Sequence, residues 1–158
     1  LPKDATLRLD MERAAREPGV FEHRRDGPAA GWRHSLGFHE SGRVPSLIEF
    51  TPEFMVDNVG DLVVARRDFG AAYHLAVVVD DAAQDITHVT RGEDLFDATR
   101  IHVVLQRLLG LPTPVYHHHR LIRDDSGKRL AKRDDARAIR TYRDEGATPA
   151  DIRRMVGL

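Results

Sequence analysis

The sequence predicts an α/β fold organised around a strand–helix–strand unit. Residues 86–90 have the β-branched pattern of a strand, which ends at Arg91. Residues 98–109 have the periodicity of an amphipathic helix, and residues 115–122 predict a second strand that leads into a turn around Gly127. Because two strands joined by a helix are half of a βαβ sheet, we expect a parallel sheet here.

The helix expected over residues 98–109 has the clearest pattern in the chain. Its apolar positions recur at helical spacing, at Ile101, Val104, Leu105, Leu108 and Leu109. Gly110 and Pro112 follow and are expected to end the helix.

The other expected elements are shorter. Residues 6–11 and 61–67 are typical of strands, whereas residues 75–79 fit a strand by their β-branched side chains and a helix by their position. After the turn, residues 136–145 predict a short helix. A second helix is expected to open at 148–151, where a cap residue, a proline and an acid stand in the order of a helix start.

Two regions differ in composition. Residues 1–58 are rich in Pro, Gly, Arg and His, and residues 27–52 within them indicate loops with brief strands at most. From residue 59 to 158 the periodicity is sharper. We therefore expect an irregular insertion or connective region over 1–58 and the main α/β unit over 59–158. A chain of 158 residues supports one domain, or one with a small appendage.

Composition limits the possible functions. A net charge of −1 gives no bulk attraction to nucleic acid, so an RNA contact would depend on local patches. The absence of cysteine fits a cytoplasmic protein and excludes a thiolate zinc site in this chain. No apolar run approaches the roughly 20 residues that span a bilayer. The chain begins at Leu1, which we take as a sign of a processed or truncated polypeptide.

Lysine is used sparingly and in one place. The chain has 24 basic residues, and two of its three lysines, Lys128 and Lys132, lie in the loop 126–133. A compact ammonium on a flexible stem suits phosphate neutralisation, although a solvated basic turn is an equally good interpretation of the loop alone. Ligands of such sheets bind at the carboxyl ends of the strands, so Arg91 and this loop are expected to face one ligand.

Four stretches together resemble a known family. They are residues 73–81, 87–95, 105–112 and the lysine loop, in this order and spacing. The series resembles the second half of the Rossmann-type catalytic domain of glutamyl-tRNA synthetases, which are class I aminoacyl-tRNA synthetases. It is most similar to their shortened paralogues, the glutamyl-Q tRNA(Asp) synthetases. Val77 stands where the longer enzymes usually have Asn, and because the chain ends soon after the loop we expect no anticodon-binding domain.

The resemblance covers residues 60–158 strongly and 7–13 weakly. It implies ATP-dependent activation of L-glutamate, with Mg²⁺, and transfer to queuosine of tRNA(Asp), by a cytoplasmic enzyme that is monomeric when complete. The family's HIGH-type loop has no counterpart here, so we expect a C-terminal half that lacks its N-terminal partner and is inactive alone. Two alternatives stay open: a truncated glutamyl-tRNA synthetase, and a non-catalytic nucleotide- or RNA-binding remnant of the fold.

The resemblance also implies roles for single residues. Tyr73 and Arg91 would contact glutamate, and their chemistry agrees, because a phenol and a guanidinium are donors suited to carboxylate oxygens. The backbone of Leu121 and Ile122 would meet the adenine of ATP. A plainer interpretation is that Tyr73 is a core residue and Arg91 a solvated one.

The lysine loop resembles the family's KMSKS signature, aligned as Arg129, Leu130, Ala131, Lys132 and Arg133. Lys132 takes the place of the catalytic lysine that steadies the ATP phosphates as pyrophosphate leaves. Arg129 replaces a lysine, which keeps the charge but changes the geometry. Ala131 replaces a serine and loses a hydroxyl.

A metal site is not expected. His117, His118 and His119 lie on a predicted strand and point alternately to opposite faces, so at most two could share an ion. His118 aligns with a histidine that is common in the family. Asp80 and Asp81 are expected to be a solvated helix end rather than a carboxylate pair, and without cysteine we expect no zinc.

Overall fold

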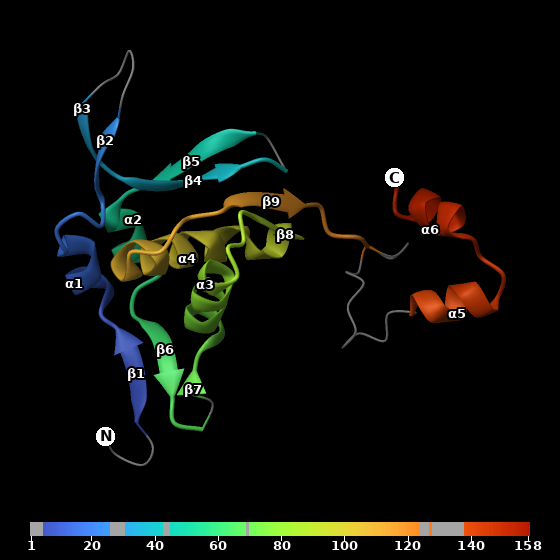
Figure 1. The fold of residues 1–158 in the computed structure, drawn as a ribbon, viewed down its shortest axis with the longest axis horizontal. Coiled ribbons are helices and arrows are strands. Elements are labelled where there is room, and N and C mark those ends of the chain that lie inside the picture. Colours follow the sequence, from blue (N-terminus) through green and yellow to red (C-terminus); the bar gives the residue numbers. More distant parts are fainter. Residues whose placement is uncertain (1–4, 26–30, 43–44, 69, 124–126, 128–137) are drawn as a thin grey trace. The chain divides into compact units, whose positions relative to one another are not determined.

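The computed structural model describes residues 5–25, 31–42, 45–68, 70–123, 127 and 138–158 (Figure 1). Contacts between residues divide the chain into two compact units, residues 1–119 and 120–158. The predicted α/β class is confirmed, since helices alternate with strands and the central sheet contains parallel strands.

A sheet of four strands forms the centre of the first unit. Its order is β5 (Ser46–Phe50), β4 (Leu36–Glu40), β9 (Val115–His119) and β8 (His88–Gly92). Strand β9 runs parallel to both β4 and β8, whereas β5 is antiparallel to β4. Strands β8 and β9 are therefore the parallel pair predicted from the sequence.

Helix α4 (Phe96–Leu109) connects β8 to β9 after one short turn, η1 (Glu93–Leu95). It packs against β4 and lies beside α3 (Tyr73–Ala83) in Figure 1. The predicted end of α4 is confirmed, because Gly110 caps it with a φ of 66°. This left-handed conformation suits a residue without a Cβ.

The hydrophobic core draws on both sides of residue 58. Helices α1 (Met11–Arg16) and α2 (Pro52–Asn58) pack on each other, and they contribute to one cluster with the central sheet and α4. Its buried members are Met11, Ala14, Ala15, Val20, Phe21, Leu36, Phe38, Phe50, Met55, Val103, Val104 and Tyr116. The division of this chain expected after residue 58 stays a prediction.

The region expected to be mostly loops contains more strand than predicted. Strand β2 (Glu22–Arg25) pairs with β3 (Gly31–His34) as a hairpin, and β4 belongs to the central sheet. Leu36 and Phe38 alternate inward along β4, but the next inward position is the buried Glu40. A charged residue at a core position interrupts the apolar alternation that identifies a strand.

Residues 75–79, which fit either a strand or a helix by sequence, are helical and pack beside a second, smaller sheet. Strand β6 (Leu62–Arg66) pairs with β1 (Thr6–Leu9) and with β7 (Gly70–Ala71). Residues 75–79 then lie within helix α3, which packs on α4 and β6. Packing against two elements decides the conformation of this β-branched run, which local propensity leaves open.

The second unit contains two short helices, α5 (Ile139–Asp144) and α6 (Pro149–Met155). The predicted start of α6 is confirmed as a capping box, in which Thr148 N donates to Asp151 Oδ2 at 2.9 Å and Asp151 N donates to Thr148 Oγ1 at 3.2 Å. The expected strand over 115–122 ends at His119. Its partner β8 has turned into η1 by then, and the ladder closes with the pair Gly92–His119.

Among the described helices, none combines the length and the apolar character that crossing a bilayer requires.

Gly42 lies where the turn after β4 touches β9. A Cβ added to Gly42 would come within 2.5 Å of the His118 carbonyl oxygen and 2.7 Å of its backbone nitrogen. The Gly42 N–H also donates to Glu40 Oε1 at 2.7 Å. The close approach of these two backbones therefore requires glycine.

We expect Gly42→Ala to destabilise the protein by about 1–3 kcal/mol, because the added methyl must push the turn away from β9. A fall in melting temperature would show this. His39→Ala is the matched control, since His39 is an exposed residue of β4 and its loss should leave the melting temperature nearly unchanged. Equal melting temperatures for Gly42→Ala and the unaltered protein would contradict the close approach.

Candidate functional site

Arg91 lies at the end of β8, opposite His118 on β9. All three nitrogens of its half-buried guanidinium contact side chains. Nε donates to His118 Nε2 at 3.2 Å, Nη1 lies 3.0 Å from His102 Nδ1, and Nη2 donates to Thr99 Oγ1. The central carbon of the guanidinium, Arg91 Cζ, also lies 5.0 Å from the centre of the Tyr116 ring, within cation–π range.

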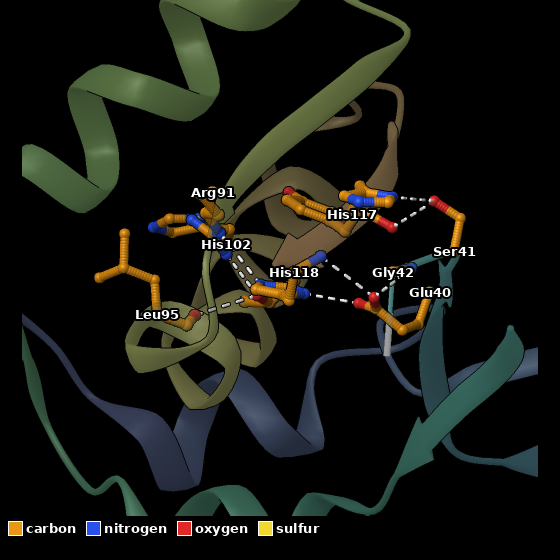
Figure 2. A network of polar contacts seen from close by, with 10 residues as sticks. Glu40, Ser41, Gly42, Arg91, Leu95, His102, His117 and His118 are labelled. Carbon is orange, nitrogen blue, oxygen red and sulfur yellow. Dashed lines mark hydrogen bonds and ion pairs between the residues drawn. The ribbon is translucent and has the colours of Figure 1, made fainter. Parts of the chain in front are cut away.

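His118 joins Arg91 to a buried carboxylate. Its Nδ1 lies 2.5 Å from Glu40 Oε2, and its backbone N–H donates to Glu40 Oε1 at 3.1 Å. Glu40 is only 3% exposed and His118 only 1%. Figure 2 shows this line of contacts from Glu40 through His118 to Arg91. A carboxylate so far from water is stable only when its oxygens accept hydrogen bonds, as they do here.

Helix α4 supplies the other side of the site through three buried polar residues. Thr99, His102 and Gln106 follow one another at spacings of three and four residues, so they share one face of the helix. Thr99 Oγ1 lies 3.0 Å from His118 Nε2 and 3.2 Å from the Leu95 carbonyl oxygen. Gln106 Nε2 donates to the Tyr116 hydroxyl at 3.0 Å. The polar face of α4 therefore meets the polar side chains of β8 and β9.

His102 connects the hydrogen-bond network to His74 on α3. Its Nε2 lies 2.9 Å from His74 Nδ1. Burial, the charge of Arg91 and the neighbouring His74 together lower the pKa of His102 to about 3. Burial and Arg91 lower the pKa of His74 as well. Both imidazoles are therefore neutral at neutral pH, and Arg91 carries the positive charge of the cluster.

The positions of the protons follow from the partners. A carboxylate only accepts hydrogen bonds, so His118 carries its proton on Nδ1 and offers Nε2 to Arg91. Arg91 only donates, so the neutral His102 accepts at Nδ1 and donates from Nε2 to His74. Donors and acceptors thus alternate along the whole line from Glu40 to His74.

Tyr73 and Arg91, the two residues expected to contact glutamate, meet around His102. Tyr73 is the first residue of α3 and is 56% exposed, and its ring centre lies 6.0 Å from that of His102. Burial lowers the pKa of Arg91, and nearby Tyr116, Tyr73 and Asp81 oppose that shift. The exposed phenol and the guanidinium therefore border one polar surface at the carboxyl end of β8.

The remaining expected site residues belong to the second unit or lie outside the described residues. Lys132 and the other KMSKS-like residues, Arg129, Leu130, Ala131 and Arg133, lie outside the described residues. Leu121 and Ile122 are half-buried in the second unit. Within the described part of the chain no group of three or more His, Asp or Glu side chains is arranged to hold a metal ion. The absence of zinc stays a prediction.

The site residues that the sequence interpretation missed include Glu40, Thr99, His102 and Gln106. The three on α4 had a signal, because their spacing repeats the helical period on a face adjoining the apolar one. The sequence signal for Glu40 was weaker: it is an acid that continues the inward alternation of Leu36 and Phe38. The predicted alternation of the histidines is confirmed, since His118 is buried and its neighbours His117 and His119 are exposed.

Comparison with solved structures supports the fold. A crystal structure of a glutamate tRNA ligase from Elizabethkingia meningosepticum, in complex with its amino acid, matches with a TM-score of 0.51 and 26% identity. The match covers 75% of this chain and 22% of that one. A glutamate-tRNA synthetase from Elizabethkingia anophelis matches with the same TM-score at 24% identity, which bears on the fold alone.

Comparison with curated sequences gives nearer relatives. A glutamyl-Q tRNA(Asp) synthetase from Rhodobacter capsulatus is 61% identical over 100% of this chain and 50% of its own length. Another from Verminephrobacter eiseniae is 39% identical over 89% of this chain and 50% of its own length. This chain thus spans about half the length of these relatives. Residues 22–158 match the family model of the catalytic domain of class I tRNA synthetases (E and Q). The chain belongs to this family of class I tRNA synthetases.

Proposed function

We propose that this chain is the glutamate-binding half of an enzyme that activates L-glutamate with ATP and transfers it to queuosine of tRNA(Asp). The relative from Rhodobacter capsulatus, which carries the name glutamyl-Q tRNA(Asp) synthetase, supports the overall reaction. The observation that carries the assignment to glutamate is the preset guanidinium of Arg91, held at all three nitrogens.

Arg91 is only half-buried, and the exposed Tyr73 lies beside it. A guanidinium has five N–H groups, and the contacts to His118, His102 and Thr99 use three of them. A further hydrogen bond joins Arg91 to Tyr73, so a carboxylate bound at this surface would meet the guanidinium and the phenol together. The exposed hydroxyl of Tyr73 adds a further donor at the same surface.

The bound group in this proposal is the side-chain carboxylate of glutamate. The α-carboxylate must attack the α-phosphorus of ATP, so an arginine fork that held it would stabilise the ground state and oppose the reaction. An arginine on the side-chain carboxylate orients the substrate without holding the reacting atoms. The same contact rejects glutamine, whose amide presents donors to a donor.

The chemical step then depends on positioning and on charge neutralisation. A carboxylate oxygen bonds to the α-phosphorus as the bond to the bridging oxygen breaks, and pyrophosphate leaves with the electron pair. Lys132, within the KMSKS-like segment, would neutralise the charge that develops on the leaving phosphates. The backbone of Leu121 and Ile122 would receive the adenine. Mg²⁺ would accompany ATP and offset part of its charge.

One alternative has an observation of its own. The likeness to glutamate tRNA ligases favours a glutamyl-tRNA synthetase, whose acceptor would be the terminal ribose of a tRNA. Val77, and the nearer relatives named for glutamyl-Q tRNA(Asp), favour queuosine instead. Glutamate transfer to tRNA(Asp) with and without queuosine separates the two. The cytoplasm and a monomeric complete enzyme remain our expectations.

Arg91→Lys should raise the KM for glutamate about 10- to 100-fold, because a two-pronged contact to a carboxylate becomes a single point charge. The measurement is glutamate-dependent ATP–pyrophosphate exchange in the full-length enzyme, meaning this chain within a protein as long as its relatives. The KM for ATP should hardly change. Arg66→Lys is the matched control, since Arg66 is exposed and pairs with Asp68. An equal loss for both substrates would contradict a glutamate-specific role.

Lys132→Ala should slow the same exchange by about 10²–10³, as typically follows the loss of one preorganised donor to a developing charge. The maximal rate should fall more than the KM for glutamate rises. Lys128→Ala provides the comparison, because it removes a lysine from the same loop outside the KMSKS-like segment. Wild-type exchange by Lys132→Ala would mean that Lys132 is an ordinary surface lysine.

The 158-residue chain by itself should show no glutamate-dependent pyrophosphate exchange. Its residues offer Arg91 for glutamate and Lys132 for phosphate, but no counterpart of the HIGH-type loop to hold ATP from the other side. The full-length enzyme is the positive control. A purified monomeric chain that forms glutamyl-adenylate would overturn the proposal that half of the site lies elsewhere.

A further inference from the structure

We propose that Glu40, His118 and Thr99 are positioning residues for Arg91, and that Glu40 acts by fixing which nitrogen of His118 carries the proton. The inference rests on the proposed function, since it assigns these residues to glutamate binding. None of the three is exposed enough to meet a substrate: Glu40 is 3% exposed, His118 1% and Thr99 0%. Their effect must therefore pass through Arg91.

The first step is the anchoring of Glu40. Its Oε1 accepts the backbone N–H groups of Gly42 at 2.7 Å and of His118 at 3.1 Å. One donor lies in the turn after β4 and the other on β9, so the two bonds fix the plane of the carboxylate between these segments. Oε2 is then directed at His118 Nδ1, 2.5 Å away. The carboxylate is held by backbone and cannot turn without losing two hydrogen bonds.

The second step is the choice of tautomer. A fixed carboxylate requires a proton on His118 Nδ1, which leaves a lone pair on Nε2. That lone pair faces Arg91 Nε–H at 3.2 Å (Figure 2). The opposite tautomer would turn an N–H toward another N–H. Glu40 therefore makes His118 an acceptor and supplies a counter-charge for the arginine through one imidazole.

The third step is the fixing of the guanidinium plane. Thr99 Oγ1 accepts from Nη2, and His102 Nδ1 receives Nη1 at 3.0 Å. Contacts at three nitrogens define the plane of a rigid group completely. With its plane fixed, the guanidinium keeps one orientation beside its further hydrogen-bond partner Tyr73, so the substrate carboxylate meets donors that need no reorganisation.

Glu40→Gln tests the tautomer step without a change of shape. The amide oxygen can still accept from the two backbone N–H groups, which places the amide NH₂ against His118 Nδ1. His118 must then accept at Nδ1 and carry its proton on Nε2, where it opposes Arg91 Nε–H. The comparable exchange of acid for amide in a Ser-His-Asp triad leaves the geometry intact and fails through the wrong tautomer.

In the full-length enzyme we expect Glu40→Gln to raise the KM for glutamate about 10- to 100-fold in pyrophosphate exchange, because the fork is misdirected. The KM for ATP should stay at the wild-type value. His117→Gln is the matched control, since His117 is the adjacent exposed residue of β9 and bonds to Ser41 rather than Arg91. A folded Glu40→Gln enzyme with wild-type glutamate KM, or with equal rises in both KM values, would overturn the inference.

Thr99→Val keeps the test decisive if Glu40→Gln does not fold. Valine has the shape of threonine but no acceptor for Arg91 Nη2, so we again expect a rise in the KM for glutamate and none in the KM for ATP. Unchanged glutamate KM in a folded Thr99→Val enzyme would overturn the inference. Arg91→Ala separates this failure from that of the proposed function. If Arg91→Ala also leaves glutamate KM unchanged, glutamate binding by Arg91 is wrong. If Arg91→Ala raises it, only the positioning role is wrong.

Discussion

A guanidinium that is half removed from water needs an acceptor on each covered side and a negative charge nearby. Arg91 is in this position, between the end of β8 and the face of α4. An unpaired cation there would cost several kcal/mol, so the sequence around it is constrained. Strand β9 supplies His118, α4 supplies Thr99 and His102, and β4 supplies a charge of opposite sign, Glu40, which reaches Arg91 through His118.

This constraint ties the two regions of the sequence together. Glu40 lies in the region that the sequence pattern separates from the main α/β unit, yet only one imidazole, that of His118, lies between its carboxylate and Arg91. The contact also explains why β4 approaches β9 so closely that Gly42 tolerates no side chain. Tight backbone packing here orients a carboxylate, the carboxylate orients an imidazole, and the imidazole orients the arginine.

Features that depend on local sequence were predictable. Helix α4 ends at Gly110 and α6 opens with its capping box as predicted, because caps act within one turn of the helix. The parallel pair of β8 and β9 was predicted from the pattern of a strand, a helix and a strand. Arg91 was identified by its resemblance to the family and by its place at the end of a strand.

Features that depend on residues distant in the sequence were not predictable. Residues 75–79 are β-branched and became helical because α3 packs on α4 and β6. Strand β9 ends at His119 because its partner β8 ends at Gly92. No residue in the sequence near His119 indicates this end. Glu40 resembles a surface acid until β9 is placed beside it. The role of a buried charge is set by which side chain lies opposite, and that is a property of the tertiary structure.

The position of one proton tests the relation between Glu40 and Arg91 most directly. Two-bond ¹H–¹⁵N spectra of the full-length enzyme, labelled with ¹⁵N in histidine, distinguish the tautomers of each imidazole at neutral pH. We expect His118 to carry its proton on Nδ1 with Nε2 unprotonated, and Glu40→Gln to reverse this pattern. A proton on Nε2 of His118 in the unaltered enzyme would contradict the idea that Glu40 sets the orientation of Arg91.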